Sequence, residues 1–408
     1  MRSSRNMIIT VVGGGSSAHV LIPFISNTFK AVNLLTRRPE LWSREVRAKY
    51  KGPEGEIRGE YSGQITLASS LPEDVIPQAD IIILCLPVSK YRPVLHRIAP
   101  HISQERDVFL GTIYGQGGFN WMFQEVKSRF ELLHTTYFAI GLIPWICRTV
   151  QYGQEGVTFG PKSVNVVAVS PRNRFSYLNE VFLRASCECV FGKGGFLLAD
   201  NFFSLTLSVD NQIIHPSRCL GLYLSSGGSW DKKEDVPLFY RDYDKLSADL
   251  LKELDADYSV LRESVKSKYS NTLFTYMLDY LALERLSYGS CNSDILASFV
   301  ASQTLGAIRT PVVRAPGGRW VLDKSSRFFS DDIYYGLCIA KWIAEKLNVE
   351  VPTIDRILGW AQSLLNDEIL CQRRLVEKNE DTGGKFKTGV PSVYGFTTVD
   401  DIIDDLEV

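Results

Sequence analysis

The sequence predicts two domains, an N-terminal α/β domain with a doubly wound parallel sheet and an all-α C-terminal domain. The chain has 408 residues, which is too long for one ordinary domain. Its first half alternates short β-branched runs with helical stretches, whereas its second half repeats leucine and isoleucine at helical spacing. We therefore expect domains over 1–200 and 201–408, with the boundary near 195–205.

Short runs of apolar and β-branched residues predict the strands of the first domain. They lie at 7–12, 31–36, 79–86, 106–113, 135–141 and 163–169. Helical stretches separate most of them, which favours βαβ units and parallel pairing. The run at 79–86 is apolar on both faces, as expected of a central strand in a parallel sheet.

Amphipathic patterns predict long helices in the second half. Apolar residues recur at helical spacing over 246–265, 333–347 and 357–365. Ser330 is the expected N-cap of the middle helix. Pro216 is expected to end the helical turn before it, because proline disfavours helical backbone at the preceding residue.

Composition and charge exclude several classes of protein. The 45 basic and 46 acidic residues leave a net charge of −1, too little to hold nucleic acid or an anionic membrane nonspecifically. The longest apolar run, 81–88, is far too short to span a bilayer. The eight cysteines and five histidines lack zinc-like spacing. We expect no metal site, free thiols and a cytoplasmic protein.

The first predicted strand runs directly into a glycine motif, Gly13-x-Gly15-x-x-Ala18. Gly13 permits a tight turn, Gly15 lets the backbone approach a pyrophosphate, and Ala18 allows close packing of helix on strand. A helix follows and a second strand comes after it, which is the context of a dinucleotide-binding Rossmann fold. The expected coenzyme contacts here are Gly13, Gly15, Ser16, Ser17 and Ala18. The alternative is a glycine turn that binds nothing.

The end of the second strand indicates which dinucleotide binds. The chain reads Thr36-Arg37-Arg38 there, without the acidic residue that usually binds the ribose 2′-OH of NAD. Arginine can instead hold a 2′-phosphate through charge-assisted hydrogen bonds. We expect NADP(H) to be preferred and NAD(H) to be possible. The alternative is a pair of solvated arginines on a surface loop.

Two further loops should face ligands, because they follow carboxyl ends of predicted parallel strands. Leu86 and Pro87 follow one strand and are expected to contact the coenzyme. The glycine-rich segment 114–119 follows another, and its Tyr114 and Gln116 are candidate polar contacts to substrate. A plain strand-to-helix turn explains that segment equally well.

His215 is the best candidate for proton transfer, because histidine titrates near neutral pH. It stands four residues after Asn211, on the same face if this turn is helical. A satisfied core histidine is the alternative. Arg327 and Asp332 form a second candidate pair at a helix start. A carboxylate there is also stabilised by the helix dipole without any catalytic task.

These elements together resemble the octopine/nopaline (opine) dehydrogenase family over nearly the whole chain. The residues that carry the resemblance are Gly13-x-Gly15-x-x-Ala18, Tyr114-Gly115-Gln116-Gly117-Gly118, Pro144-Trp145-Ile146-Cys147-Arg148, Asn211-x-x-x-His215-Pro216, Leu238-Phe239-Tyr240, Arg327-Phe328-Phe329-x-x-Asp332 and Thr353-Ile354-Asp355. The Asn-x-x-x-His-Pro and Arg…Asp elements are fairly specific, whereas the glycine motif is not.

The resemblance implies a Rossmann domain followed by an all-helical opine-dehydrogenase domain, with the active site between them. It implies reductive condensation of an amino acid with a 2-oxo acid such as pyruvate. It also implies that His215 is the acid/base, that Asp332 pairs with it and that Arg327 holds a substrate carboxylate. Tyr240 and Asn211 are expected near substrate. Arg37 and Arg38 depart from the acidic residue of NAD-using members.

Two other functions fit the same architecture. One is an NADP-dependent reductase of 2-oxo or 3-hydroxy acids that needs no amine. The other is a non-catalytic NADP(H)-binding sensor, which would not require His215, Arg327 or Asp332. We expect small-molecule partners, no nucleic acid or membrane, and a monomer or homodimer. The sequence does not reveal which amino acid or which 2-oxo acid is used.

Overall fold

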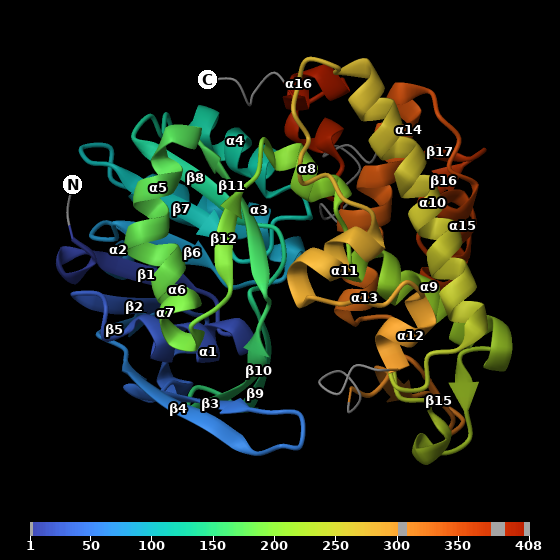
Figure 1. Cartoon of the computed structure of the whole chain (residues 1–408), viewed down its shortest axis with the longest axis horizontal. Coiled ribbons are helices and arrows are strands. Elements are labelled where there is room, and N and C mark those ends of the chain that lie inside the picture. Colours follow the sequence, from blue (N-terminus) through green and yellow to red (C-terminus); the bar gives the residue numbers. More distant parts are fainter. Residues whose placement is uncertain (1–2, 301–307, 377–387, 404–408) are drawn as a thin grey trace.

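The computed structural model describes residues 3–300, 308–376 and 388–403. Figure 1 shows a sheet-containing half, coloured blue to green, beside a helical half, coloured from green through yellow to red. The change from sheet to helices follows the strand that ends at Leu198. The domain limits given above, 1–200 and 201–408, stay a prediction.

An eight-stranded sheet forms the centre of the first half. In spatial order its strands are β12 (Gly195–Leu198), β11 (Val164–Ser170), β8 (Thr135–Ile140), β7 (Val108–Thr112), β6 (Ile81–Leu84), β1 (Ile8–Val12), β2 (Ala31–Leu35) and β5 (Leu67–Ser69). Every neighbouring pair is parallel except β8 and β11. All six predicted strands are confirmed. Strand β1 lies between β2 and β6, where the strand order reverses and doubly wound folds bind ligands.

Helices cover both faces of this sheet. They are α1 (Ser16–Ile25), α2 (Pro72–Val75), α3 (Tyr91–Ile98), α4 (Phe119–Arg129), α5 (Phe175–Leu178), α6 (Arg184–Ser186) and α7 (Glu188–Phe191). A second sheet, which the sequence did not predict, packs against α1. Its strands in order are β4 (Ile57–Gln64), β3 (Glu45–Lys51), β10 (Glu155–Pro161) and β9 (Trp145–Gln151).

The second half is mainly helical, as predicted. Its helices are α8 (Phe202–Leu207), α9 (Asn211–Ser226), α10 (Lys245–Lys268), α11 (Tyr280–Tyr288), α12 (Ile295–Val300), α13 (Arg327–Ser330), α14 (Cys338–Leu347), α15 (Pro352–Leu365) and α16 (Val399–Ile403). Short strands lie at the edges: β13 (Ser229–Trp230), β14 (Val312–Arg314), β15 (Trp320–Leu322), β16 (Leu370–Cys371) and β17 (Arg374–Leu375).

Two local expectations were wrong. Pro216 does not end a helix, because α9 continues to Ser226 and its apolar residues are buried against other helices. Tertiary packing therefore outweighs the missing backbone hydrogen bond at the proline. Ser330 does not cap the helix predicted over 333–347. It is the last residue of α13, whose N-cap is Ser326.

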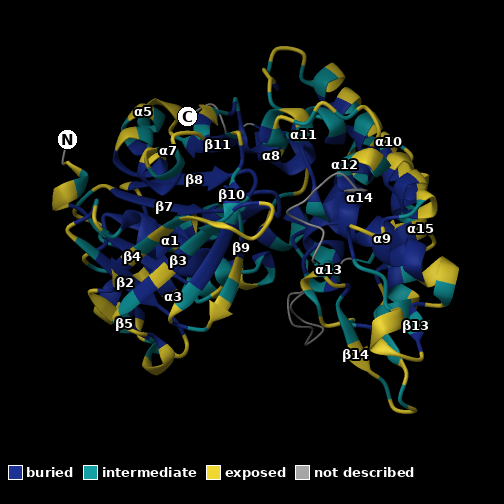
Figure 2. Ribbon diagram, turned by 60° about the horizontal axis from the view of Figure 1, so that its bottom comes forward, coloured by how far each residue is buried: buried dark blue, intermediate teal, exposed yellow. Residues whose placement is uncertain are grey.

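The apolar interior is continuous between the two halves. One core contains sheet residues such as Leu84 and Leu110 together with helical residues such as Phe203, Ile213 and Leu261. A second core fills the other face of the sheet, beneath α1. Figure 2 shows the buried strands in dark blue and the exposed outer turns of the helices in yellow. Burial of this shared surface holds the halves together.

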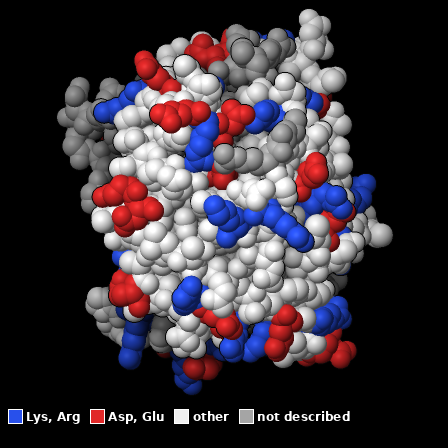
Figure 3. All heavy atoms as spheres, turned by 90° about the vertical axis from the view of Figure 1, so that its left-hand side faces the viewer, with Lys and Arg blue, Asp and Glu red and all other residues white. Residues whose placement is uncertain are grey.

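The surface carries mixed charge. On the face in Figure 3, basic and acidic side chains are interspersed among uncharged ones. Within the described ranges, no helix has the length and apolar character needed to cross a membrane. In the same residues no cluster of histidine, cysteine or acidic side chains could hold a metal ion. All eight cysteines lie in described segments and none forms a disulfide.

Candidate active site

His215 lies in the second turn of α9 and is held on three sides. Its Nδ1 lies 2.7 Å from Oδ2 of Asp332, and its Nε2 lies 3.1 Å from the hydroxyl of Tyr240. Its ring stacks on Phe328, with 3.8 Å between centroids. Because a carboxylate only accepts, Nδ1 carries the proton and neutral Nε2 accepts from Tyr240. Histidine and aspartate are both buried.

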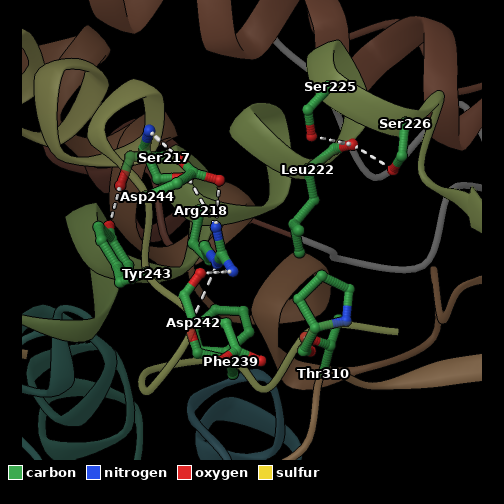
Figure 4. Close-up of polar contacts among 12 residues, drawn as sticks. Ser217, Arg218, Leu222, Ser225, Ser226, Phe239, Asp242, Tyr243, Asp244 and Thr310 are labelled. Atoms are coloured by element: carbon green, nitrogen blue, oxygen red, sulfur yellow. Dashed lines mark hydrogen bonds and ion pairs between the residues drawn. The ribbon is translucent and has the colours of Figure 1, made fainter. Parts of the chain in front are cut away.

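Tyr240 belongs to the loop between η7 (Lys233–Asp235) and α10, and a buried arginine fixes this loop. Arg218, in α9, donates to the carbonyls of Phe239 (3.2 Å) and Asp242 (2.6 Å) and pairs with Asp244 (2.8 Å). Figure 4 shows its guanidinium pointing into the loop. Arg218 is fully buried. Burial raises the pKa of Tyr240, so its hydroxyl stays protonated as the donor to His215.

Asp332 precedes a π-helical turn, η8 (Ile333–Leu337), that leads into α14. Arg327 lies one turn earlier, and its carbonyl accepts from the amides of Asp331 and Asp332. The Arg327 side chain is exposed and makes no hydrogen bond or ion pair to another described residue. Its guanidinium is therefore available to a carboxylate.

Asp331 joins this element to the first half. The side chain of Ser89, in the turn after the β6 loop that contains Leu86 and Pro87, lies beside its carboxyl. Burial raises the pKa of Asp331, and the neighbouring charge of Asp332 adds to the effect. The candidate catalytic aspartate is thus adjacent in sequence to a contact between the halves.

The other predicted substrate contacts differ in whether their side chains already have hydrogen-bond partners within the protein. The Tyr114 hydroxyl donates to Oε1 of Gln116 (2.9 Å), whose Nε2 donates to the carbonyl of Ser208. Nε2 of Gln212, in α9, donates to the Gln116 carbonyl (3.2 Å). Gln116 therefore connects the β7 loop to α8 and α9. The Asn211 side chain is partly exposed and has no hydrogen-bond partner in the described segments.

The glycine turn fits a dinucleotide. Gly13 has φ of +116°, and a Cβ there would meet the Cys85 carbonyl at 2.4 Å, so the turn requires glycine. A Cβ on Gly15 would meet only that oxygen, at 3.7 Å, so protein contacts do not explain this glycine. Space remains for a ligand beside the N-terminus of α1. There the amides of Ser16 and Ser17 have no partner among described residues.

The end of β2 places Thr36 in the interior and Arg37 and Arg38 at the surface. The Arg38 guanidinium lies 4.6 Å from the ring centroid of Tyr152, which is in the β9–β10 turn. Burial alone would raise the pKa of Tyr152, but the neighbouring polar groups of Trp42, Thr36 and Arg38 hold it below its usual value. Tyr152 thus positions one of the two candidate phosphate-binding arginines.

Nothing in the sequence indicated that several other residues lie near this site. Arg218 and Tyr152 act through side chains that are distant along the chain. Phe328 was visible only as part of a motif. In the sequence, Lys162 and Glu284 look like ordinary surface polar residues. Only the fold brings them near the predicted residues, whose catalytic and binding roles stay predictions.

Comparison with known proteins identifies the helical half. Residues 198–365 match the sequence model of the NAD/NADP octopine/nopaline dehydrogenase alpha-helical domain. The chain is similar to octopine/nopaline dehydrogenases over this domain and to curated opine dehydrogenases over nearly its whole length. The resemblance inferred from the motifs is therefore confirmed.

Curated members of the opine dehydrogenase family align with nearly the whole chain. Tauropine dehydrogenase of Arabella iricolor is 24% identical, and the alignment covers 97% of this chain and 100% of the relative. Octopine dehydrogenase of Pecten maximus is 22% identical, with 97% and 98% covered.

Solved opine dehydrogenases share the fold. Octopine dehydrogenase with NADH and pyruvate superimposes with a TM-score of 0.78 at 21% identity, covering 98% of each chain. NADP⁺-bound yersinopine dehydrogenase has a TM-score of 0.64 at 16% identity, covering 98% of this chain and 99% of the other. The prediction of a Rossmann-type domain followed by an opine-dehydrogenase helical domain is confirmed.

Proposed function

We propose that this chain is an opine dehydrogenase that condenses the amine of an amino acid with a 2-oxo acid and reduces the product to a secondary-amine dicarboxylate. The observation that carries the proposal is the placement of His215 between Asp332 and Tyr240. Arg327, which has no partner among the described residues, directly precedes Phe328, whose ring stacks on His215. The activities named for the family's tauropine and octopine dehydrogenases support it.

A nicotinamide dinucleotide would bind at the glycine turn and supply the hydride that reduces the imine carbon. Gly13 and Gly15 would let its pyrophosphate approach α1. Arg37 and Arg38 would hold a 2′-phosphate, which supports a preference for NADP(H). NAD(H) remains a usable coenzyme in this proposal, because only the phosphate contact distinguishes the two.

The proton chemistry is assigned to Nε2 of His215. Condensation forms a carbinolamine, and its hydroxyl needs a proton to leave as water. Asp332 keeps the other proton on Nδ1 and stabilises the imidazolium, so Nε2 is the atom that takes up and returns a proton. Tyr240, hydrogen-bonded to Nε2, lies on this path. The stack on Phe328 fixes the ring plane.

Arg327 is assigned to the carboxylate of the 2-oxo acid. Its planar guanidinium can bind two carboxylate oxygens at once, which fixes the orientation of the reacting carbon. Asn211 and Tyr114 are offered as further polar contacts to substrate. Gln116 acts through Tyr114, because its side-chain amide is already engaged with that hydroxyl and with the Ser208 carbonyl.

The test is a coenzyme-oxidation screen that pairs amino acids with pyruvate, glyoxylate and 2-oxoglutarate. We expect NADPH oxidation only when both an amino acid and a 2-oxo acid are present. Oxidation with the 2-oxo acid alone would indicate a 2-oxo acid reductase instead. Absence of oxidation with every pair, in a folded protein that binds NADPH, would indicate a coenzyme-binding sensor.

A further inference from the structure

The β9–β10 hairpin of the second sheet lies against the coenzyme-binding glycine turn, although 133 residues separate Ser16 from Thr149. The amide of Thr149 donates to Oγ of Ser16 (3.0 Å), and the amide of Gly153 donates to Nε2 of His19 (2.7 Å). Burial lowers the pKa of His19, so the ring is neutral and its proton is on Nδ1, which donates to the Gly15 carbonyl (2.8 Å). The hairpin is thereby joined to the start of α1, where a pyrophosphate would bind.

Aromatic packing fixes the ring of Tyr152 in the turn of this hairpin. Its centroid lies 5.5 Å from that of His19 and 5.8 Å from that of Trp42, and both of these residues are buried. Gly153 follows with φ of +73°, and a Cβ there would meet the Leu41 carbonyl at 2.0 Å, so the turn closes only with glycine. The backbone and the two rings therefore hold Tyr152 at one position relative to α1.

The hydroxyl of Tyr152 lies where the glycine turn meets the end of β2. A Cβ on Gly14 would meet this hydroxyl at 2.7 Å and Oγ1 of Thr36 at 3.1 Å. In dinucleotide-binding folds, residues at this end of the second strand recognise the 2′ position of the adenosine ribose. The contact also accounts for Gly14, which stands at a position that the glycine motif leaves open, since a side chain there would collide with the tyrosine.

An arginine lies over the ring of Tyr152. The guanidinium carbon of Arg38 is 4.6 Å from the ring centroid. Arg38 is exposed, and a free arginine side chain loses much rotamer freedom when it binds a ligand. The ring attracts the cation without using any of its N–H groups, so the guanidinium is held in place and keeps its donors for an anion.

We propose that Tyr152 determines the coenzyme specificity together with Arg38. Its ring holds the Arg38 guanidinium in place, and its hydroxyl donates a hydrogen bond to the 2′-phosphate of NADP(H). This inference rests on the proposed function and adds to it a residue from outside the Rossmann motif, supplied by the second sheet. NAD(H) carries no such phosphate, so neither contact improves its binding.

The experiment measures the binding of NADPH and NADH by calorimetry in the absence of substrates. The two coenzymes differ only in the 2′-phosphate, so the ratio of their Kd values reports the contacts to that group. We expect the native protein to bind NADPH more tightly. Tyr152→Phe keeps the ring and loses the hydroxyl, and it should weaken NADPH binding by about 10-fold. Tyr152→Leu also loses the support of Arg38 and should weaken it by about 30-fold. The Kd for NADH should stay nearly unchanged in both variants.

Further variants make the result interpretable. Tyr223→Leu removes a tyrosine that is 39% exposed on α9 and should leave both Kd values unchanged. Arg38→Ala, alone and combined with Tyr152→Leu, completes a double-mutant cycle for NADPH. The two single losses should sum to more than the loss in the double variant, because the tyrosine acts partly through Arg38. Thermal unfolding checks that each variant is folded.

The outcomes separate this inference from the proposed function. An unchanged ratio of the two Kd values in either Tyr152 variant would overturn the inference. An equal loss of affinity for both coenzymes would also overturn it, since it would limit Tyr152 to shaping the turn. Equal affinity of the native protein for both coenzymes would do the same, while the two-substrate oxidation screen, run with NADH, still decides the opine dehydrogenase activity. Absence of binding of either coenzyme would remove the proposed function, and the inference with it.

Discussion

Nδ1 of His215 lies 2.7 Å from Oδ2 of Asp332, although 117 residues separate them along the chain. The pair comes from the start of α9 and from the turn before η8. Each element positions only one of the two side chains, so the pair forms only when both elements are packed together. The bond sets the tautomer of His215 and leaves Nε2 for proton transfer. This arrangement leads directly to the first prediction.

Replacement of His215 by Ala should lower kcat by about 10²–10⁴-fold, because the general acid/base is lost. Coenzyme affinity should not change, since the glycine turn lies elsewhere. The measurement is steady-state NADPH oxidation, together with coenzyme titration by fluorescence. His134→Asn, at an exposed position, is the control. Unchanged turnover in the His215 variant would show that another group moves the proton.

Arg327→Lys should raise the KM for the 2-oxo acid by about 10- to 100-fold with a smaller change in the KM for the amino acid. A lysine ammonium cannot reproduce the two parallel hydrogen bonds of a guanidinium to a carboxylate. Initial rates at varied pyruvate and fixed amino acid measure the effect. An equal rise in both KM values would contradict the assignment of Arg327 to the 2-oxo acid.

Replacing both Arg37 and Arg38 by Ala should raise the KM for NADPH by about 10- to 100-fold and leave the KM for NADH nearly unchanged. The lost contacts are those to the 2′-phosphate. Arg47→Ala removes an exposed arginine from β3 and serves as the control. Equal catalytic efficiency of the native enzyme with NADPH and NADH would remove this role for both arginines.

Arg218→Met should lower the free energy of unfolding by about 3 kcal/mol, because buried carbonyls and the Asp244 carboxylate lose their donor. The loop from Phe239 to Asp244 then loses its anchor, and Tyr240 with it. Urea denaturation measures the stability. A kcat decrease in the folded variant would mark Arg218 as a positioning residue. An unchanged kcat would limit its role to stability.

Glu284 gives a stability prediction with a defined sign. Its folded-state pKa of about 7 lies above the ordinary value of 4.5, so the folded form binds a proton more tightly than the unfolded form does. The resulting stabilisation is complete below pH 4.5, is lost as pH rises to about 7 and is absent above. The loss amounts to about 3 kcal/mol.

The measurement is the free energy of unfolding of the native protein and of Glu284→Gln at pH 5 and pH 8. The variant, which cannot ionise, should lose less stability between the two values. Asp210, Lys162 and Tyr288 face the same group and are present in both proteins. The difference between the two profiles therefore reports the Glu284 carboxyl together with its effect on the pKa of Lys162 and Tyr288. Parallel pH profiles would contradict an unpaired carboxylate at this position.

The sequence predicted the main sheet well and the second sheet not at all. Strand β6 is apolar throughout and is buried on both faces, which gives a clear signal. Strand β4 reads Ile-Arg-Gly-Glu-Tyr-Ser-Gly-Gln, and most of it is exposed. Nothing in such a run indicates a strand, because its pairing with β3 and its contact with α1 depend on the assembled fold.

The candidate site was predicted only in part, because some of its residues carry a local sequence signal and others depend on the assembled fold. His215, Asp332 and Arg327 belong to motifs that a family resemblance can detect. Glu284 has the appearance of any polar residue on an amphipathic helix. It stands out only because its carboxyl has no hydrogen-bond partner among the described residues, which is a property of three-dimensional packing. The predicted helix end at Pro216 was wrong because the apolar contacts that stabilise α9 outweigh the local backbone preference of proline.

The apolar core that passes from the sheet into the helices limits how this protein can be divided or recombined. Division of the chain near residue 200 would yield two fragments, each with a large exposed apolar surface. If the coenzyme-binding half were exchanged between related enzymes, the core residues of both halves that meet at this boundary would have to be changed together. A change of substrate would instead require only single substitutions of side chains that face the ligand, which leave the shared core intact.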